Sequence, residues 1–197
     1  MPLEPISRVV LTLFAAIIGF GLKKIIEENA IDTNYGVDNW IVFLITLSLS
    51  LRFFIDSAIH TSVQYVQNNP SPNIINFIYD MLVLITLGTL IAFMCYADSP
   101  KAYLKLSILF FGVAIAWWVI EWIFWSLAIG IFWIIINLAH LAVYAVVLLK
   151  VLQADDGIIS VWYWYGILFA SIVFLILDLY LQLKNSAGRI QNTKVQQ

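Results

Sequence analysis

Long apolar runs, separated by short polar connectors, make up most of this sequence. A helix that crosses a lipid bilayer needs about 20 mostly apolar residues. The runs that meet this length are residues 6–26, 40–66, 74–96, 104–126, 131–151 and 161–183. The pattern therefore predicts an all-α fold with one transmembrane domain over residues 1–183. We expect a bundle of six transmembrane helices, followed by a short polar C-terminal tail at residues 184–197.

The connectors contain the proline and polar residues that usually end helices, as in "QNNPSPN" and "ADSPKA". One boundary has no such signal. Residues 106–149 form a run about twice the length of one span, and Glu121 and His140 are its only ionisable residues. We place the turn at residues 126–130, "SLAIG", which predicts a tight helical hairpin there.

Composition supports a membrane location. The chain is 62% hydrophobic and 11% charged, with a mean hydropathy of +0.94, whereas soluble domains carry about 25% charged residues. The first apolar run ends in "GFGLKK" without a small-residue cleavage site, so we expect a retained span. The net charge of −2 gives no basic field for a nucleic-acid partner. The single cysteine, Cys95, excludes an internal disulfide and a cysteine zinc cluster.

Six spans place both termini on one side of the membrane, which we call the tail side. Lysine and arginine residues number four on the tail side and five on the other, so the positive-inside rule alone does not choose. Lys23 and Lys24, on the opposite side, stand beside Glu27 and Glu28, whereas the basic residues of the tail side have almost no acidic neighbours. We therefore expect a multi-pass protein whose termini face the cytoplasm.

Aromatic side chains favour the two membrane surfaces because their rings are amphipathic. The cluster "WWVIEWIFW", residues 117–125, is expected to serve interfacial contacts and packing. The residues that we place at the surface opposite the tail side are Trp40, Tyr96, Tyr103, Trp162 and Trp164.

Ionisable residues interrupt five of the six predicted spans, and we place all of them toward the tail side. At 1.5 Å per residue they lie about 8 to 21 Å below that surface. A charged side chain at the bilayer centre costs about 2.5 to 3.5 kcal/mol, so separate placement would be expensive. We expect them to share one polar cavity, closed on the far side by an apolar plug. This polar layer comprises Arg52, Asp56, His60, Gln64, Asp80, Glu121, Asn137, His140 and Asp178.

The deepest part of the polar layer is the stretch "LRFFIDSAIH". Arg52, Asp56, His60 and Gln64 follow one another at intervals of four, so they share one helical face. We expect Arg52 to pair with Asp56 within the helix and to form the floor of the cavity. His60 would lie nearer water, where its charge can change between about pH 5 and 8.

Intramembrane ionisable residues usually mark ion pathways and proton relays. The sequence therefore predicts a channel or transporter for a proton or small ion, with the lipid bilayer and the conducted ion as its partners. Six spans are few for a carrier built from two inverted halves, which favours a homo-oligomer.

Three alternatives stay open. The polar layer could serve interhelical pairing in a structural or assembly protein. His60 and His140 lie at similar depth and could hold haem, or zinc together with Asp56 or Asp80. No CxxCH or second histidine pair supports such a group, so no cofactor or metal is predicted. A membrane-embedded lipid enzyme lacks any GxSxG or HExxH signature, and no catalytic residue is predicted.

Overall fold

The computed structural model describes residues 4–28, 39–62, 73–125, 131–154 and 160–195. All secondary structure in these ranges is α-helical, which confirms the predicted fold class. The helices are α1 (Glu4–Glu28), α2 (Asn39–Ser62), α3 (Ile74–Cys95), α4 (Pro100–Trp125), α5 (Ile131–Gln153) and α6 (Val161–Val195).

The helix bounds lie within a few residues of the predicted spans, with one larger difference at the C-terminus. Helix α6 continues to Val195, so most of the segment expected as a polar tail has helical backbone. Helix α4 begins at Pro100, earlier than expected, because Ser99 Oγ accepts a hydrogen bond from the Ala102 amide and caps this end. The turn proposed at residues 126–130 and the predicted end of α2 lie outside the described residues.

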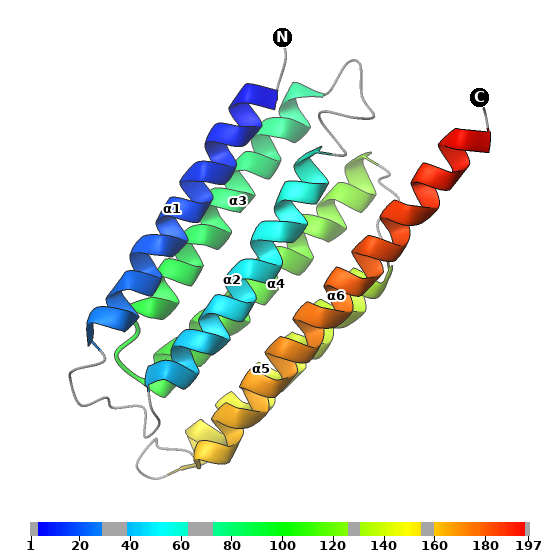
Figure 1. Cartoon of the computed structure of the whole chain (residues 1–197). Coiled ribbons are helices and arrows are strands. Elements are labelled where there is room, and N and C mark those ends of the chain that lie inside the picture. Colours follow the sequence, from blue (N-terminus) through cyan, green and yellow to red (C-terminus); the bar gives the residue numbers. More distant parts are fainter. Residues whose placement is uncertain (1–3, 29–38, 63–72, 126–130, 155–159, 196–197) are drawn as a thin grey trace.

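The helices run up and down and pack as a closed bundle (Figure 1). Going around the bundle, the contacts link α1 to α3, then α4, α5, α6 and α2, which returns to α1; α2 also touches α3. The start of α1 and the end of α6 lie at the same end of the bundle (Figure 1). Helix α2 therefore has neighbours on several sides, and it is the helix that carries the "LRFFIDSAIH" stretch.

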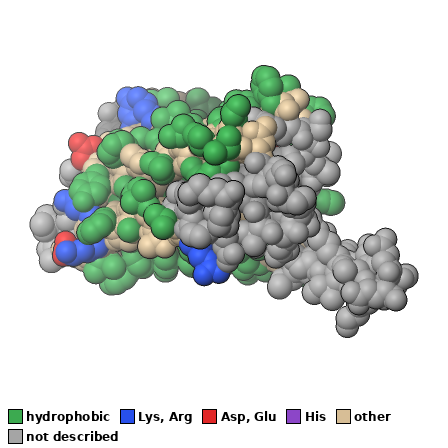
Figure 2. Space-filling model, turned by 90° about the horizontal axis from the view of Figure 1, so that it is seen from above, with side chains coloured by type: hydrophobic (Ala, Val, Ile, Leu, Met, Phe, Trp, Pro, Cys, Tyr) green, Lys and Arg blue, Asp and Glu red, His purple; other side chains and the backbone are tan. Residues whose placement is uncertain are grey.

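Lipid-compatible side chains cover much of the described surface. Large apolar residues are widely exposed, among them Phe20 at 70%, Phe169 at 72% and Trp162 at 76%. Figure 2 shows hydrophobic side chains over most of the described surface in that view, with basic and acidic groups at a few places only. Soluble proteins rarely expose apolar area so continuously.

Five helices are long and apolar enough to cross a membrane: Trp40–Thr61, Ile74–Cys95, Pro100–Phe124, Phe132–Gln153 and Val161–Leu181. These helices indicate an integral membrane protein. Helix α1 is not among the five, a result that covers only the described residues. The sixth span and the division into domain and tail therefore stay predictions.

Helices α1 and α3 approach closely because the glycines at their contact have no side chain. A methyl group on Gly88 would lie 2.7 Å from Cδ2 of Phe14, whose ring is fully buried. A methyl group on Gly21 would lie 3.0 Å from both Ala92 Cα and Cys95 Sγ. Small residues commonly permit such contacts between membrane helices.

Two aromatic residues expected at the depth of the membrane surface face the interior of the bundle and not the lipid-facing side. Tyr103 and Trp164 are both 0% exposed, and their rings meet at a centroid distance of 5.8 Å. Tyr103 Oη lies 2.9 Å from the hydroxyl of the buried Thr46. A buried phenol needs such a partner, so the half of the bundle away from the tail side also contains hydrogen-bonded polar groups.

Gly88→Ala should destabilise the protein by about 1–3 kcal/mol, because the added methyl group overpacks the contact with Phe14. Gly112→Ala is the matched control, since no atom lies within 4 Å of a methyl group added there. Thermal melting in detergent micelles measures the difference. Equal melting temperatures for the two variants would contradict the close α1–α3 contact.

Candidate functional site

The contacts divide the polar layer into two clusters, which lie at successive turns of α2. We call the first the arginine cluster; it consists of Arg52, Asp56, His140 and Asp178. The second is the histidine cluster, which consists of His60, Asp80 and Glu121. Together they bring side chains of α2, α3, α4, α5 and α6 into the bundle interior. The structure thus brings together seven of the nine residues of the predicted polar layer, in two groups.

In the arginine cluster, Arg52 joins α2 to α5 and α6. Its Nε donates to Asp178 Oδ2 at 2.6 Å, and the two side chains are 1% and 6% exposed. Its Nη1 lies 3.1 Å from Nδ1 of His140. A guanidinium group can only donate, so Nδ1 accepts and the neutral imidazole carries its proton on Nε2. The His140 ring is held between Phe111 and Phe174, at centroid distances of 4.9 and 4.3 Å.

Asp56 differs from its expected role as the main partner of Arg52. Its Oδ2 accepts a 3.0 Å hydrogen bond from Trp133 Nε1 on α5. Asp56 also lies within electrostatic reach of Arg52 and Asp178. The short ion pair of Arg52 nevertheless runs between helices and not along α2, because α6 places Asp178 beside the Nε edge of the guanidinium.

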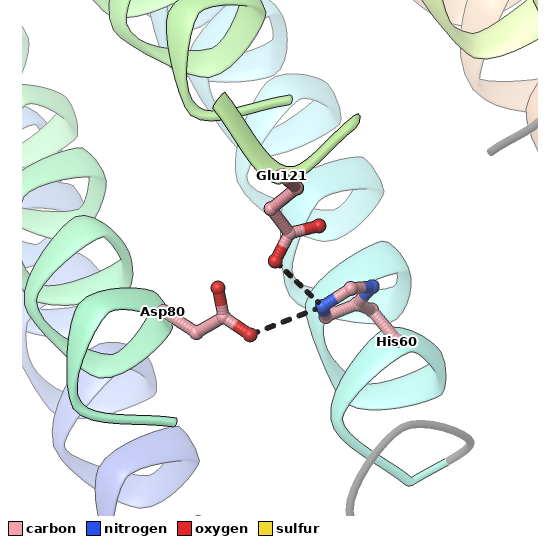
Figure 3. Close-up of side chains that lie close together, drawn as sticks. All are labelled: His60, Asp80 and Glu121. Atoms are coloured by element: carbon pink, nitrogen blue, oxygen red, sulfur yellow. Dashed lines mark hydrogen bonds and ion pairs between the residues drawn. The ribbon is translucent and has the colours of Figure 1, made fainter. Parts of the chain in front are cut away.

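In the histidine cluster, one imidazole lies between two carboxyl groups from different helices (Figure 3). His60 Nε2 is 3.2 Å from Asp80 Oδ2 and 3.4 Å from Glu121 Oε1. Figure 3 shows both carboxyl groups pointing toward the imidazole. The Asp80 and Glu121 side chains are each 1% exposed, whereas that of His60 is 25% exposed. Access to the cluster is therefore past the imidazole, near the tail-side end of α2.

Tryptophan rings connect the two clusters. Trp117 Nε1 donates to Asp80 Oδ1 at 2.9 Å, and its ring stands edge-on to His60 at 5.4 Å. Trp117 also meets Trp133, the donor to Asp56, at a centroid distance of 6.5 Å and an interplanar angle of 88°. An acid of each cluster is thus held by an indole, and the two indoles touch.

Two members of the predicted polar layer stand apart from these clusters. Asn137 is buried, and its Nδ2 donates to the carbonyl oxygen of Trp133 at 2.8 Å, one turn earlier on the same helix. Its Oδ1 has no hydrogen-bond partner in the described part of the chain. Gln64 lies outside the described residues.

Sequence reasoning missed the tryptophans as members of the site. Trp117 precedes Glu121 by one helical turn, so the spacing within "WWVIEWIFW" could have placed both on one face. Asn76 was also missed; it precedes Asp80 by one turn, is 2% exposed, and its Oδ1 lacks a hydrogen-bond partner among the described residues.

Carboxyl groups outnumber fixed positive charges in the two clusters. Four carboxyl groups belong to them, those of Asp56, Asp80, Glu121 and Asp178, and the only fixed cation is Arg52. An unbalanced charge in a low-dielectric interior is expensive. The clusters can therefore stabilise additional cations, whether protons or metal ions.

The two histidines belong to different clusters, which bears on the haem and zinc alternatives. His140 Nδ1 is bonded to a guanidinium group, and aromatic rings cover its imidazole. A positively charged neighbour disfavours a bound metal cation. The alternative in which His60 and His140 together hold one haem or zinc therefore does not fit this arrangement.

Comparisons with known protein families, with characterised proteins and with solved structures find no match to this chain.

Arg52→Met should destabilise the protein by about 3–5 kcal/mol, because it leaves Asp178 as a buried carboxylate without its counter-charge. The double variant Arg52→Met/Asp178→Leu should recover a large part of that loss, since apolar replacement of a buried ion pair is often tolerated. Melting of the wild type and the variants in lipid nanodiscs measures both effects. If the double variant were no more stable than Arg52→Met, the pair would not be the source of the effect.

Trp117→Phe should cost about 1–3 kcal/mol, because the ring is retained while the buried Asp80 carboxyl loses a donor. Trp118→Phe is the matched control: this neighbouring indole is also buried and stacks on Trp133, with a centroid distance of 6.0 Å. Chemical unfolding in mixed micelles compares them. A larger loss for Trp118→Phe would argue against the hydrogen bond to Asp80.

Proposed function

We propose that this protein transports a small cation, protons included, across the membrane. The observation that carries the proposal is the excess of buried carboxyl groups over fixed positive charge in the two clusters. Intramembrane acids are the usual stations of proton and cation pathways. The five helices that contribute these side chains are those long and apolar enough to span the membrane.

The contacts of Arg52 favour a cation over an anion as the transported species. A free guanidinium group in the membrane could attract an anion. Here Nε is bonded to Asp178 and Nη1 to His140, and Asp56 lies within electrostatic reach, whereas Nη2 is buried without a hydrogen-bond partner among the described residues. Two carboxyl groups thus accompany the single guanidinium group, which disfavours an additional anion there.

The packing of side chains between the arginine cluster and the end of the bundle opposite the tail side favours a carrier over a permanently open pore. The fully buried Phe53, next to Arg52, packs edge-on against Phe110 and Phe111, with centroid distances of 4.4 and 6.2 Å. Beyond them the bonded hydroxyls of Thr46 and Tyr103 offer polar groups without charge. An ion that leaves the clusters in that direction needs a rearrangement of these aromatic side chains.

A structural role is the second candidate, and the Arg52–Asp178 pair favours it. The pair is deeply buried and holds α2 against α6, as a packing device would. Buried ion pairs can set which helices associate without serving chemistry. The histidine cluster is less easily explained this way, because its imidazole is partly exposed and its two acids share a single imidazole.

In this proposal the tail side faces the cytoplasm, so the partly exposed His60 receives cations from that compartment. We also expect copies of the chain to associate in the membrane. A shallow apolar hollow between α5 and α6, lined by Ala142, Val143, Gly166 and Ile167 among others, offers a surface for a second copy or for lipid.

Flux through vesicles reconstituted with the full chain tests the proposal. Proton and potassium fluxes should exceed those of empty vesicles under an imposed potential, and chloride flux should not. Asp56→Asn should lower the cation flux by about tenfold or more, because a charged station is removed from the path.

Asp98→Asn is the matched control, since this acid is exposed in the connector before α4. Its flux should equal that of the wild type. Folded wild-type protein that conducts no cation, or that conducts chloride instead, would contradict the proposal and leave the structural role.

A further inference from the structure

The atoms of the histidine cluster are arranged as three ligands of one ion would be. One ligand atom from each of His60, Asp80 and Glu121 lies within 4.8 Å of the others. The nitrogen–oxygen separations are 3.2 and 3.4 Å. A tetrahedral zinc ion with bonds of about 2.0–2.2 Å would place neighbouring ligand atoms about 3.3–3.6 Å apart. The two nitrogen–oxygen separations therefore match those of neighbouring zinc ligands, and the two carboxylates also lie within 4.8 Å of each other.

The Glu121 carboxyl group supplies an independent reason to expect a ligand. Its side chain is 1% exposed and points into the cluster (Figure 3). Neither oxygen makes a hydrogen bond in the parts of the chain that the structure describes; Oε1 lies 3.4 Å from His60 Nε2, and the Asp80 carboxyl group is within electrostatic reach. Buried carboxyl oxygens are normally satisfied by donors or by metal ions.

Charge also favours a divalent ion in this place. In the state that can bind a metal, with both carboxylates ionised and the imidazole neutral, the three groups would carry a charge of −2, and the Arg52 guanidinium is bonded to the other cluster. One divalent cation brings this charge to zero. A monovalent ion would leave the site negative.

The surroundings hold the ligands in position. The three residues come from α2, α3 and α4, and regular helices fix their backbones. Trp117 donates to Asp80 Oδ1, which leaves Oδ2 directed at His60. Hydrogen bonds of this kind orient carboxylates in metal sites and strengthen binding.

We propose that His60, Asp80 and Glu121 bind one divalent transition-metal cation, with Zn²⁺ as the best fit. One imidazole nitrogen and two carboxylate oxygens suit Zn²⁺, Fe²⁺ or Mn²⁺, whereas Mg²⁺ prefers an all-oxygen octahedron. Three protein ligands leave a fourth position open. Asn76 Oδ1, one turn before Asp80 on the same helix face, is a candidate for that position.

Other acids and thiols of the described chain are less suitable. The arginine cluster contains a guanidinium group, which repels a metal ion. Cys95 is buried in α3, 15 residues after Asp80, and therefore about 22 Å farther along the helix. Among the residues that the structure describes, the histidine cluster is accordingly the best-suited place for zinc.

That the bound metal ion is also the transported ion rests on the proposed function. Binding of the ion is tested separately, without any measurement of flux. A folded protein that binds zinc but moves no cation would refute transport and leave the site. A protein that moves protons but binds no zinc would refute the site and leave transport.

Binding is measured on the purified, tag-free full chain in detergent, stripped of metal and dialysed against Zn²⁺ or Mg²⁺. Elemental analysis should find one zinc per chain and no stoichiometric magnesium. Titration calorimetry should show that Glu121→Gln weakens zinc binding at least about 100-fold, because a ligand matters more than the groups that orient it. Trp117→Phe should weaken binding about 10-fold or more for the orienting role.

One matched variant serves as the control. Glu27→Gln removes an exposed acid that pairs with Lys23. It should bind zinc as the wild type does. The proposal is overturned if folded wild-type protein binds no stoichiometric zinc, or if Glu27→Gln weakens binding as much as Glu121→Gln. The wild-type measurement decides even if a variant fails to fold.

Discussion

Charged groups inside a membrane must be balanced by other groups of the same bundle, and this constraint organises the protein. The 2.6 Å ion pair of the buried Arg52 with Asp178 shows this balance most directly. Neither side chain could stay buried without the other, so the contact holds α2 against α6. The remaining acids find an indole or an imidazole, and these partners come from still other helices. The polar groups thereby define how the helices associate.

The helices and the membrane location could be predicted from the sequence, because both depend on local properties. A run of apolar residues defines a span wherever it occurs, and capping residues such as Ser99 refine its ends. The depth of each polar residue follows from counting along its own helix. Seven of the nine residues of the polar layer lie in two clusters of the bundle interior, whereas the single shared cavity stays a prediction.

The pairing of these residues could not be predicted, because it depends on helix rotation and neighbour order. Spacing alone favoured Arg52 with Asp56, yet the rotation of α6 brings Asp178 closer to the guanidinium. The same limit applies to Tyr103 and Trp164, which have the composition of surface residues but face the core. Their partners lie on helices far away in the sequence, and no periodic pattern reveals them.

One feature of α2 has a mechanical consequence. Arg52 and His60 are eight residues apart on the same helix, so they are separated by about 12 Å of rigid backbone. A turn or slide of this helix would displace both at once. The contacts of Arg52 with α6 and those of His60 with α3 and α4 are therefore mechanically coupled through α2.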